Sequence, residues 1–131
     1  MDKIIKIIAG LFAVIVIASL AFFLVGSSPQ AGPSTPPSVI YYFWGDGCPH
    51  CEHIKPFIDN LTQKYPDADI QVLEVWKNQT NQVIYAQANA AAGVTNYGVP
   101  EVIYGNVVLM GENEIPAKME ALVKDYLKKK H

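Results

Sequence analysis

The sequence predicts an α/β domain in which helices flank a mixed four-stranded sheet, preceded by one N-terminal transmembrane helix. Residues 39–44 form a β-branched and aromatic run that is apolar on both faces, as in a strand buried within a sheet. Segments with helical spacing alternate with the apolar runs that follow, which is typical of α/β domains. Residues 7–25 form a block of nineteen uncharged residues, long enough to span a membrane.

The composition is that of one small domain. The chain has 131 residues, 2 cysteines and a net charge of −2. From residue 38 onward eight lysines stand against eleven acidic residues, which argues against a nucleic-acid partner. Two cysteines are too few for a disulfide-dense scaffold. We expect a monomer with a single domain after the apolar block.

Residues 1–25 contain the predicted membrane anchor. A helix over its uncharged block would span roughly 28 Å, close to the thickness of a hydrocarbon core. Lys3 and Lys6 precede the block and no charge follows it before Asp46, so the N-terminus is expected in the cytoplasm and the remainder outside. The same residues also resemble a signal peptide cleaved after Ser27, although the apolar block is longer than usual. Either interpretation exports the domain, and cleavage would give a secreted form.

Residues 26–38 read GSSPQAGPSTPPS and form the predicted linker. Their proline, serine and glycine content offers nothing to bury and disfavours both helix and sheet. We expect a semi-extended tether between the anchor and a domain at residues 39–131.

The elements of that domain follow from apolar spacing and from residues that begin or end helices. The predicted strands cover residues 39–44, 70–76, 101–104 and 107–110, and the predicted helices about residues 48–65, 80–92 and 115–130. Pro49 suits the first turn of the first helix, Pro66 stops that helix, and Gly93 is a C-cap for the second. Gly105-Asn106 predicts a hairpin between the last two strands. The residues expected to face the sheet are Ile54, Phe57, Ile58, Leu61, Ile115, Met119, Leu122, Val123, Tyr126 and Leu127.

Cys48 and Cys51 stand three positions apart at the predicted start of the first helix. The first turn brings two such side chains close enough to form a disulfide. Cys48 is expected to be exposed, near backbone N–H groups and a helix dipole that favour an anion. Such a position lowers the pKa of a thiol from about 8.5 into the range ~3.5–7.5, and a stable thiolate makes the disulfide more oxidising. We therefore predict Cys48 as the nucleophile and Cys51 as the buried resolving thiol.

The motif CPHC after an aromatic strand, followed about fifty residues later by YGVP, a hairpin and an amphipathic helix, resembles the thioredoxin superfamily. The resemblance covers roughly residues 39–130 and implies a thioredoxin-like fold with the short layout of a minimal thioredoxin or glutaredoxin. It implies a cis-proline at Val99-Pro100, opposite the reactive cysteine, where Val99 presents backbone groups to an extended substrate. The pair Pro49-His50 is that of the bacterial periplasmic disulfide oxidases, in which the histidine stabilises the thiolate.

Two positions depart from the family pattern. Tyr42 stands where many thioredoxins have a buried acid, so the proton of the resolving thiol is left to another group, such as Glu74, or to water. Gly47 replaces the usual tryptophan before the motif, which makes the peptide-facing rim less bulky. Trp44 and Asp46 are expected to replace part of that rim.

Other uses of the cysteine pair remain open at this point. A CxxC motif is often half of a zinc site, and His50 and His53 would complete a Cys2His2 set on paper. Ligands crowded into six residues at one helix start do not easily surround a metal, so we expect no structural metal. A thioredoxin-like carrier of a soft metal such as copper would use the same thiols without turnover. A redox-inactive interaction module is a third class.

The resemblance and the residues together predict a membrane-tethered, extracytoplasmic thiol–disulfide oxidoreductase without a prosthetic group. The predicted catalytic residues are Cys48, Pro49, His50 and Cys51, and the predicted substrate-binding residues are Trp44, Val99 and Pro100. Protein thiols and disulfides would be the substrates, and turnover would need a membrane or extracytoplasmic redox partner. The Pro-His pair favours an oxidase or isomerase over a reductase, although tethered reductases that serve cytochrome maturation also face outward.

Overall fold

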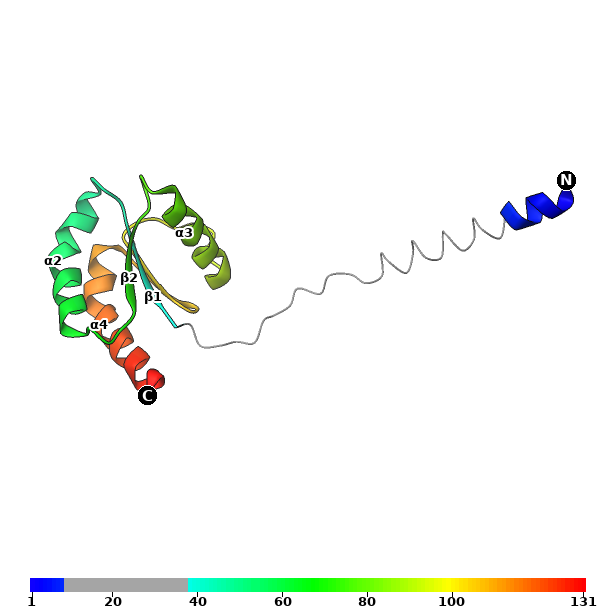
Figure 1. The fold of residues 1–131 in the computed structure, drawn as a ribbon. Helices are drawn as coiled ribbons and strands as arrows, with labels where there is room; N and C mark the ends of the chain where they lie inside the picture. The colour runs from blue at the N-terminus through cyan, green and yellow to red at the C-terminus, as the bar shows by residue number, and fades with distance from the viewer. Residues whose placement is uncertain (9–37) are drawn as a thin grey trace. The chain divides into compact units, whose positions relative to one another are not determined.

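The computed structural model describes residues 1–8 and 38–131, drawn as ribbon in Figure 1. The chain divides into two units after Ser34, and in the first of them residues 2–8 are helical. Most of the predicted anchor and nearly all of the predicted linker, residues 9–37, lie outside the described residues. Within the described ranges, no helix has the length and apolar character needed to cross a membrane.

The second unit has the element order predicted from the sequence. The elements are β1 (Ile40–Trp44), α2 (Pro49–Lys64), β2 (Ile70–Glu74), α3 (Gln79–Ala92), β3 (Glu101–Tyr104), β4 (Val107–Met110) and α4 (Gly111–Lys130). Gly93 ends α3 in the left-handed conformation, with φ of 74°, and so acts as the predicted C-cap. Gly105, with φ of 61°, forms with Asn106 the predicted turn between β3 and β4.

Two element boundaries differ from the predictions by more than one residue. β2 ends at Glu74 rather than at Trp76, because the Glu74 carboxylate accepts hydrogen bonds from the backbone of the next residues and turns the chain. α4 begins at Gly111, four residues earlier than predicted, with Glu112 and Glu114 in its first turn. Acidic side chains are favourable at a helix N-terminus. Glu114 also accepts a 3.0 Å hydrogen bond from the backbone N–H just before the helix.

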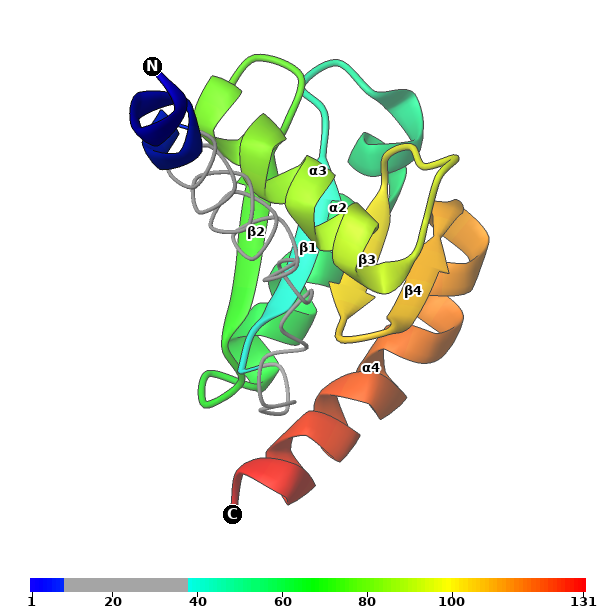
Figure 2. The same cartoon turned by 90° about the vertical axis from the view of Figure 1, so that its right-hand side faces the viewer.

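The four strands form one mixed sheet in the order β2-β1-β3-β4. β1 pairs with β2 in parallel and with β3 antiparallel, and β3 and β4 form an antiparallel hairpin (Figure 2). β1 is therefore an interior strand, and its Ile40, Tyr42 and Phe43 side chains are buried. Its apolar sequence predicted this position, and its carboxyl end leads into the cysteine motif.

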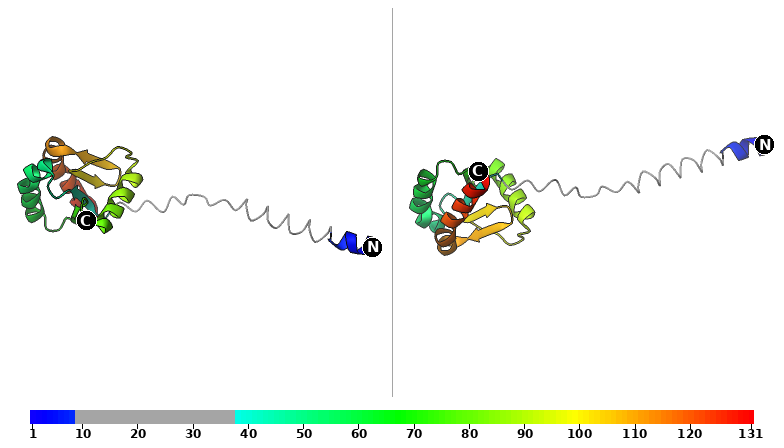
Figure 3. Two further views of the ribbon diagram at one scale, coloured as in Figure 1. Left: turned by 90° about the horizontal axis from the view of Figure 1, so that it is seen from above. Right: turned by 90° about the horizontal axis from the view of Figure 1, so that it is seen from below.

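Helices cover both faces of the sheet, with α2 and α4 on one side and α3 on the other (Figure 1, Figure 3). The predicted helix positions that are buried on the α2–α4 side are Ile54, Ile58, Leu61, Ile115, Met119, Val123 and Tyr126. Phe57, Leu122 and Leu127 are only partly buried at the edge of this core. On the other side, α3 packs over Phe43, Val75 and Ile103. Each fully buried apolar side chain contributes about 1.5–3 kcal/mol, so both layers hold β1 in place.

Candidate active site

Cys48 and Cys51 form a disulfide at the start of α2, with their Cα atoms 5.3 Å apart. The backbone N–H of Cys48 donates a 3.0 Å hydrogen bond to the carbonyl oxygen of Gly45, which fixes the loop from β1. Cys48 is also the N-cap of α2, because its Sγ accepts a 3.3 Å hydrogen bond from the backbone N–H of Cys51. A sulfur in this position is stabilised as a thiolate once the disulfide opens.

The expectation that Cys48 is exposed is wrong for the disulfide form. Cys48 is only 3 % exposed and Cys51 only 2 % exposed. The carbonyl oxygen of Val99 lies 3.9 Å from Cys48 Sγ, and the loop that carries it helps to cover the sulfur. Pro49 and His50, between the two cysteines, are exposed.

Val99 and Pro100 lie in the loop before β3, against the disulfide. The peptide bond between them is cis. The carbonyl oxygen of Pro100, a buried residue, accepts a 2.9 Å hydrogen bond from the backbone N–H of Gly111 at the start of α4. The structure thus brings the two loop residues named from the resemblance next to the cysteine pair.

His50, His53 and Glu112 form a polar cluster beside the disulfide. The Nδ1 atoms of His50 and His53 lie 3.2 and 2.9 Å from the same carboxylate oxygen of Glu112. Hydrogen bonds from His53 and then His50 hold the pKa of Glu112 below its usual value. Glu112 comes from α4 and the histidines come from α2, so the sequence did not indicate this contact. Among residues 1–8 and 38–131, no three His, Cys, Asp or Glu side chains are arranged to hold a metal ion.

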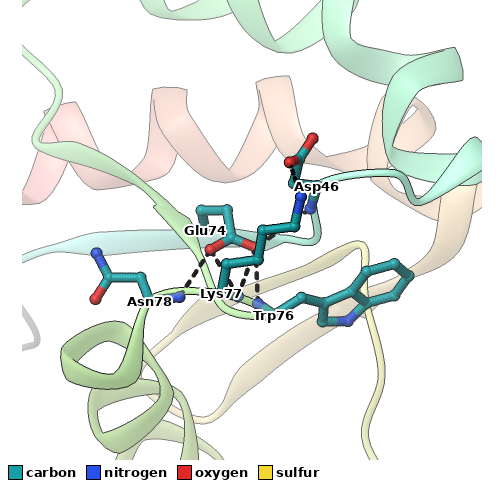
Figure 4. Close-up of polar contacts among 5 residues, drawn as sticks. All are labelled: Asp46, Glu74, Trp76, Lys77 and Asn78. Atoms are coloured by element: carbon teal, nitrogen blue, oxygen red, sulfur yellow. Dashed lines mark hydrogen bonds and ion pairs between the residues drawn. The ribbon is translucent and has the colours of Figure 1, made fainter.

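Glu74 organises the loop that follows β2 (Figure 4). Its carboxylate accepts hydrogen bonds of 2.7–3.2 Å from the backbone N–H groups of Asp46, Trp76, Lys77 and Asn78. Desolvation acts to raise the pKa of Glu74, but the four hydrogen bonds together hold it below its usual value. The sequence left Glu74 as a candidate for the proton of the resolving thiol. In the structure it is instead an ionised group that accepts hydrogen bonds from this turn.

Trp76 forms an exposed aromatic surface next to the cysteine loop. Its ring lies so close to Gly45 that a Cβ added there would be 2.3 Å from a ring atom, yet Trp76 is 52 % exposed. Trp44, expected on the rim, is only partly exposed and packs against the core. Asp46, also expected there, forms an ion pair with Lys77. The large exposed aromatic side chain at this loop is therefore Trp76, which was predicted to end the second strand.

A cleft of about 130 Å³ lies beside Cys51. Its lining comes from β1, β2 and α2 and consists of Tyr42, Trp44, Cys51, Glu52, Lys55, Ile58, Asp59 and Val72. Burial, and secondly the charge of Asp59, raises the pKa of Tyr42 to about 12. Tyr42 therefore stays protonated at neutral pH and does not replace an acid as proton acceptor. The cleft connects Cys51 with the exposed Lys55–Asp59 ion pair instead.

Comparison with protein-family models gives a match that includes most of the residues of this site. The thioredoxin family model matches residues 34–103, which is more than half of the chain. The matched segment contains the cysteine pair, the Val99–Pro100 loop and β1 through most of β3. No curated protein sequence matches the chain. Its matched segment, its four-stranded mixed sheet flanked by helices and its disulfide all lead to one conclusion: the chain belongs to the thioredoxin family.

Proposed function

We propose that this protein is a membrane-tethered thiol–disulfide oxidoreductase that acts on exported proteins. The observation that carries the proposal is the Cys48–Cys51 disulfide at the N-terminus of α2, beside the carbonyl oxygen of Val99. The helix start stabilises Cys48 as a thiolate, and α2 keeps Cys51 within reach of it. A disulfide that opens and re-forms in this way suits a redox catalyst.

Exchange proceeds through a mixed disulfide in this proposal. In the oxidising direction a substrate thiolate attacks Cys48 Sγ, and the Cys48–Cys51 bond breaks with its electron pair going to Cys51. A second substrate thiolate then attacks the substrate sulfur of the mixed disulfide, and Cys48 leaves as a thiolate. The substrate dithiol has lost two electrons, which the protein now holds on Cys48 and Cys51. Of the two protons that the substrate thiols release, one goes to Cys51 and the other to solvent while Cys48 remains a thiolate. Reduction of a substrate is the reverse sequence.

The loop before β3 is the proposed docking site for the substrate. Val99 lies beside Cys48, so a substrate segment that pairs with its backbone has its own sulfur held near Cys48. The exposed ring of Trp76 adds apolar surface on which substrate side chains can pack. Protein thiols and disulfides are the substrate class that fits this arrangement.

The N-terminal sequence supports a location outside the cytoplasm. Lys3 and Lys6 before the apolar residues 7–25 indicate an anchor with its N-terminus inside. Oxidising compartments are also where protein disulfides form and persist. Turnover there requires a membrane or extracytoplasmic partner that returns the dithiol to the disulfide. The Pro49-His50 pair supports an oxidase or isomerase over a reductase.

The reduction potential of the Cys48–Cys51 couple tests the direction of exchange. We expect about −120 to −180 mV, the range of the oxidases and isomerases, when the full chain in mild detergent is equilibrated in glutathione buffers. A value near about −270 mV would make the protein a reductase. Tight binding of Cu(I) by the reduced chain, without exchange with glutathione, would favour the soft-metal carrier.

His50→Ala is expected to make this potential more negative by about 30 mV or more, which is roughly tenfold in the equilibrium constant. In the disulfide oxidases that the Pro-His pair resembles, the histidine stabilises the thiolate of the reactive cysteine. Removing the His50 imidazole is therefore expected to destabilise the reduced form of the protein. His53→Ala is the matched control, because His53 contacts the same oxygen of Glu112 but lies outside the pair. Equal shifts in the two variants would show that the charge of the whole cluster, and not His50, sets the potential.

A further inference from the structure

Glu101 is a buried acid that directly follows Pro100. It is 0 % exposed, and the sheet register places it between Phe43 of β1 and Met110 of β4. One of its carboxyl oxygens, Oε2, accepts a 2.9 Å hydrogen bond from Nδ2 of Asn89, a fully buried residue of α3. The thiol chemistry proposed above gives Glu101 no part.

The buried polar atoms around Glu101 have too few hydrogen-bond donors if its carboxyl group is ionised. Glu101 Oε1, Tyr85 Oη and Asn89 Oδ1 are buried and have no partner among the described residues. Both N–H groups of the Asn89 amide are in use, since Nδ2 also donates a 3.1 Å bond to the carbonyl oxygen of Tyr85. If Glu101 is ionised, the Tyr85 hydroxyl is the one remaining donor, whereas two oxygens, Glu101 Oε1 and Asn89 Oδ1, need a donor. A proton on Glu101 adds a second donor to this buried set and so reduces the shortfall.

Among the described residues, no opposite charge compensates Glu101. Tyr85 and Asn89 face it from α3, and Tyr97 reaches the cluster only through its ring contact with Tyr85. In the part of the chain that the structure describes, no lysine or histidine forms an ion pair with Glu101. Burial raises the pKa of Glu101, and the hydrogen bond from Asn89 and the nearby hydroxyl of Tyr85 offset only part of this effect. Burial, and secondly Glu101, also raises the pKa of Tyr85, which therefore remains a donor.

We propose that Glu101 is a positioning residue of the substrate-binding loop, which keeps a proton at neutral pH and fixes the Val99–Pro100 segment to α3. Glu101 is bonded to Pro100, and the carbonyl oxygen of Val99 lies 3.9 Å from Cys48 Sγ. Its hydrogen bond with Asn89 therefore anchors the loop two residues from the disulfide contact. The role of the loop rests on the proposed function, whereas the protonation of Glu101 does not.

The pH dependence of unfolding tests whether Glu101 keeps its proton in the folded chain. The unfolded chain releases the Glu101 proton above a pH of about 4.3, whereas the folded chain keeps it. The folding equilibrium constant therefore falls as pH rises, by up to about tenfold per unit, until the folded chain also releases the proton. Glu101→Gln keeps the shape of the protonated acid but does not titrate. We expect the oxidised full chain in mild detergent to lose stability relative to this variant between about pH 5 and pH 7.

Glu120→Gln is the control for removing a carboxylate. Hydrogen bonds from Lys64, Tyr65 and Lys124 lower the pKa of Glu120 to about 2, so its contribution is lost in acid and is constant above about pH 5. Parallel profiles for the wild type and Glu101→Gln in this range would overturn the proposal. If Glu101→Gln does not fold, the pKa of Glu101 can be measured directly in the wild type by carbon-13 NMR of labelled glutamate carboxyl groups. One carboxyl resonance should titrate above the others, and titration of every glutamate in the usual range would also overturn the proposal.

Kinetics test the positioning role. Glu101→Ala is expected to raise KM for a reduced protein substrate several-fold and to leave the rate with dithiothreitol and the reduction potential unchanged, because a small thiol does not need the loop. Glu101→Gln should restore KM. If Glu101→Ala lowers the rate with the protein substrate and the rate with dithiothreitol equally, Glu101 has a purely structural role and the proposed positioning role is wrong. Absence of exchange with either thiol in the wild type would count against the proposed function, while the pH result would still apply.

Discussion

Cys51→Ser is expected to trap the protein in mixed disulfides that run through Cys48. In the disulfide form the Cys51 backbone N–H donates to Cys48 Sγ and the Cα atoms are 5.3 Å apart, so Cys51 is placed to displace a substrate bound there. Serine removes the resolving thiol but leaves Cys48 at the helix start, and the adduct persists. Cys48→Ser should instead lower exchange by roughly 10³-fold or more, because the nucleophile is lost and Cys51 is buried within α2.

Non-reducing electrophoresis of the full chain, incubated with a disulfide-containing protein, measures this difference. Cys51→Ser should give adducts that disappear with dithiothreitol, and Cys48→Ser and the double variant should give none. Adducts of Cys48→Ser equal to those of Cys51→Ser would reverse the assigned roles. If neither single variant gives adducts while both remain folded, the catalytic proposal is wrong.

The sequence was sufficient for the order of elements because the signals for them are local. A run that is apolar on both faces fits only a strand with a layer on each side, and β1 is that strand. Gly105-Asn106 permits a tight reversal, and the two short strands around it pair as predicted. Helical spacing likewise identified Ile115 and Met119, both fully buried in α4. The cysteine spacing identified the disulfide for the same reason, since one helical turn sets the distance.

The parts of the site that the sequence missed depend on contacts between distant segments. Cys48 was expected to be exposed, but Val99, 51 residues away, lies over its sulfur. Glu112 reaches His50 from the first turn of α4. The apolar spacing predicted that this helix begins only at about residue 115, so Glu112 was not expected to lie in it. Glu101 looked like an ordinary strand residue, and only the register and the packing of α3 bury it. No local pattern in the chain encodes these neighbours.

Gly45→Ala is expected to displace the Trp76 ring and to lower the free energy of unfolding by about 1–3 kcal/mol. A Cβ at position 45 would lie 2.3, 2.5 and 2.7 Å from three atoms of the ring, far inside van der Waals contact. The ring is half exposed and can move outward, but it then loses its packing on the loop before Cys48. The apolar surface beside the disulfide moves with it, so KM for protein substrates should rise.

A double-mutant cycle with Trp76→Ala separates the ring from the backbone. If Gly45→Ala acts by displacing the ring, it should add little once Trp76 is alanine, and the two effects should be strongly non-additive in chemical denaturation. Gly98→Ala is the matched control for stability, because a Cβ there meets no atom within 4 Å, and its effect should stay within about 0.5 kcal/mol. Additive effects of Gly45→Ala and Trp76→Ala would show that Gly45 is required by the backbone of its loop. The position of the Trp76 ring would then not depend on its packing against Gly45.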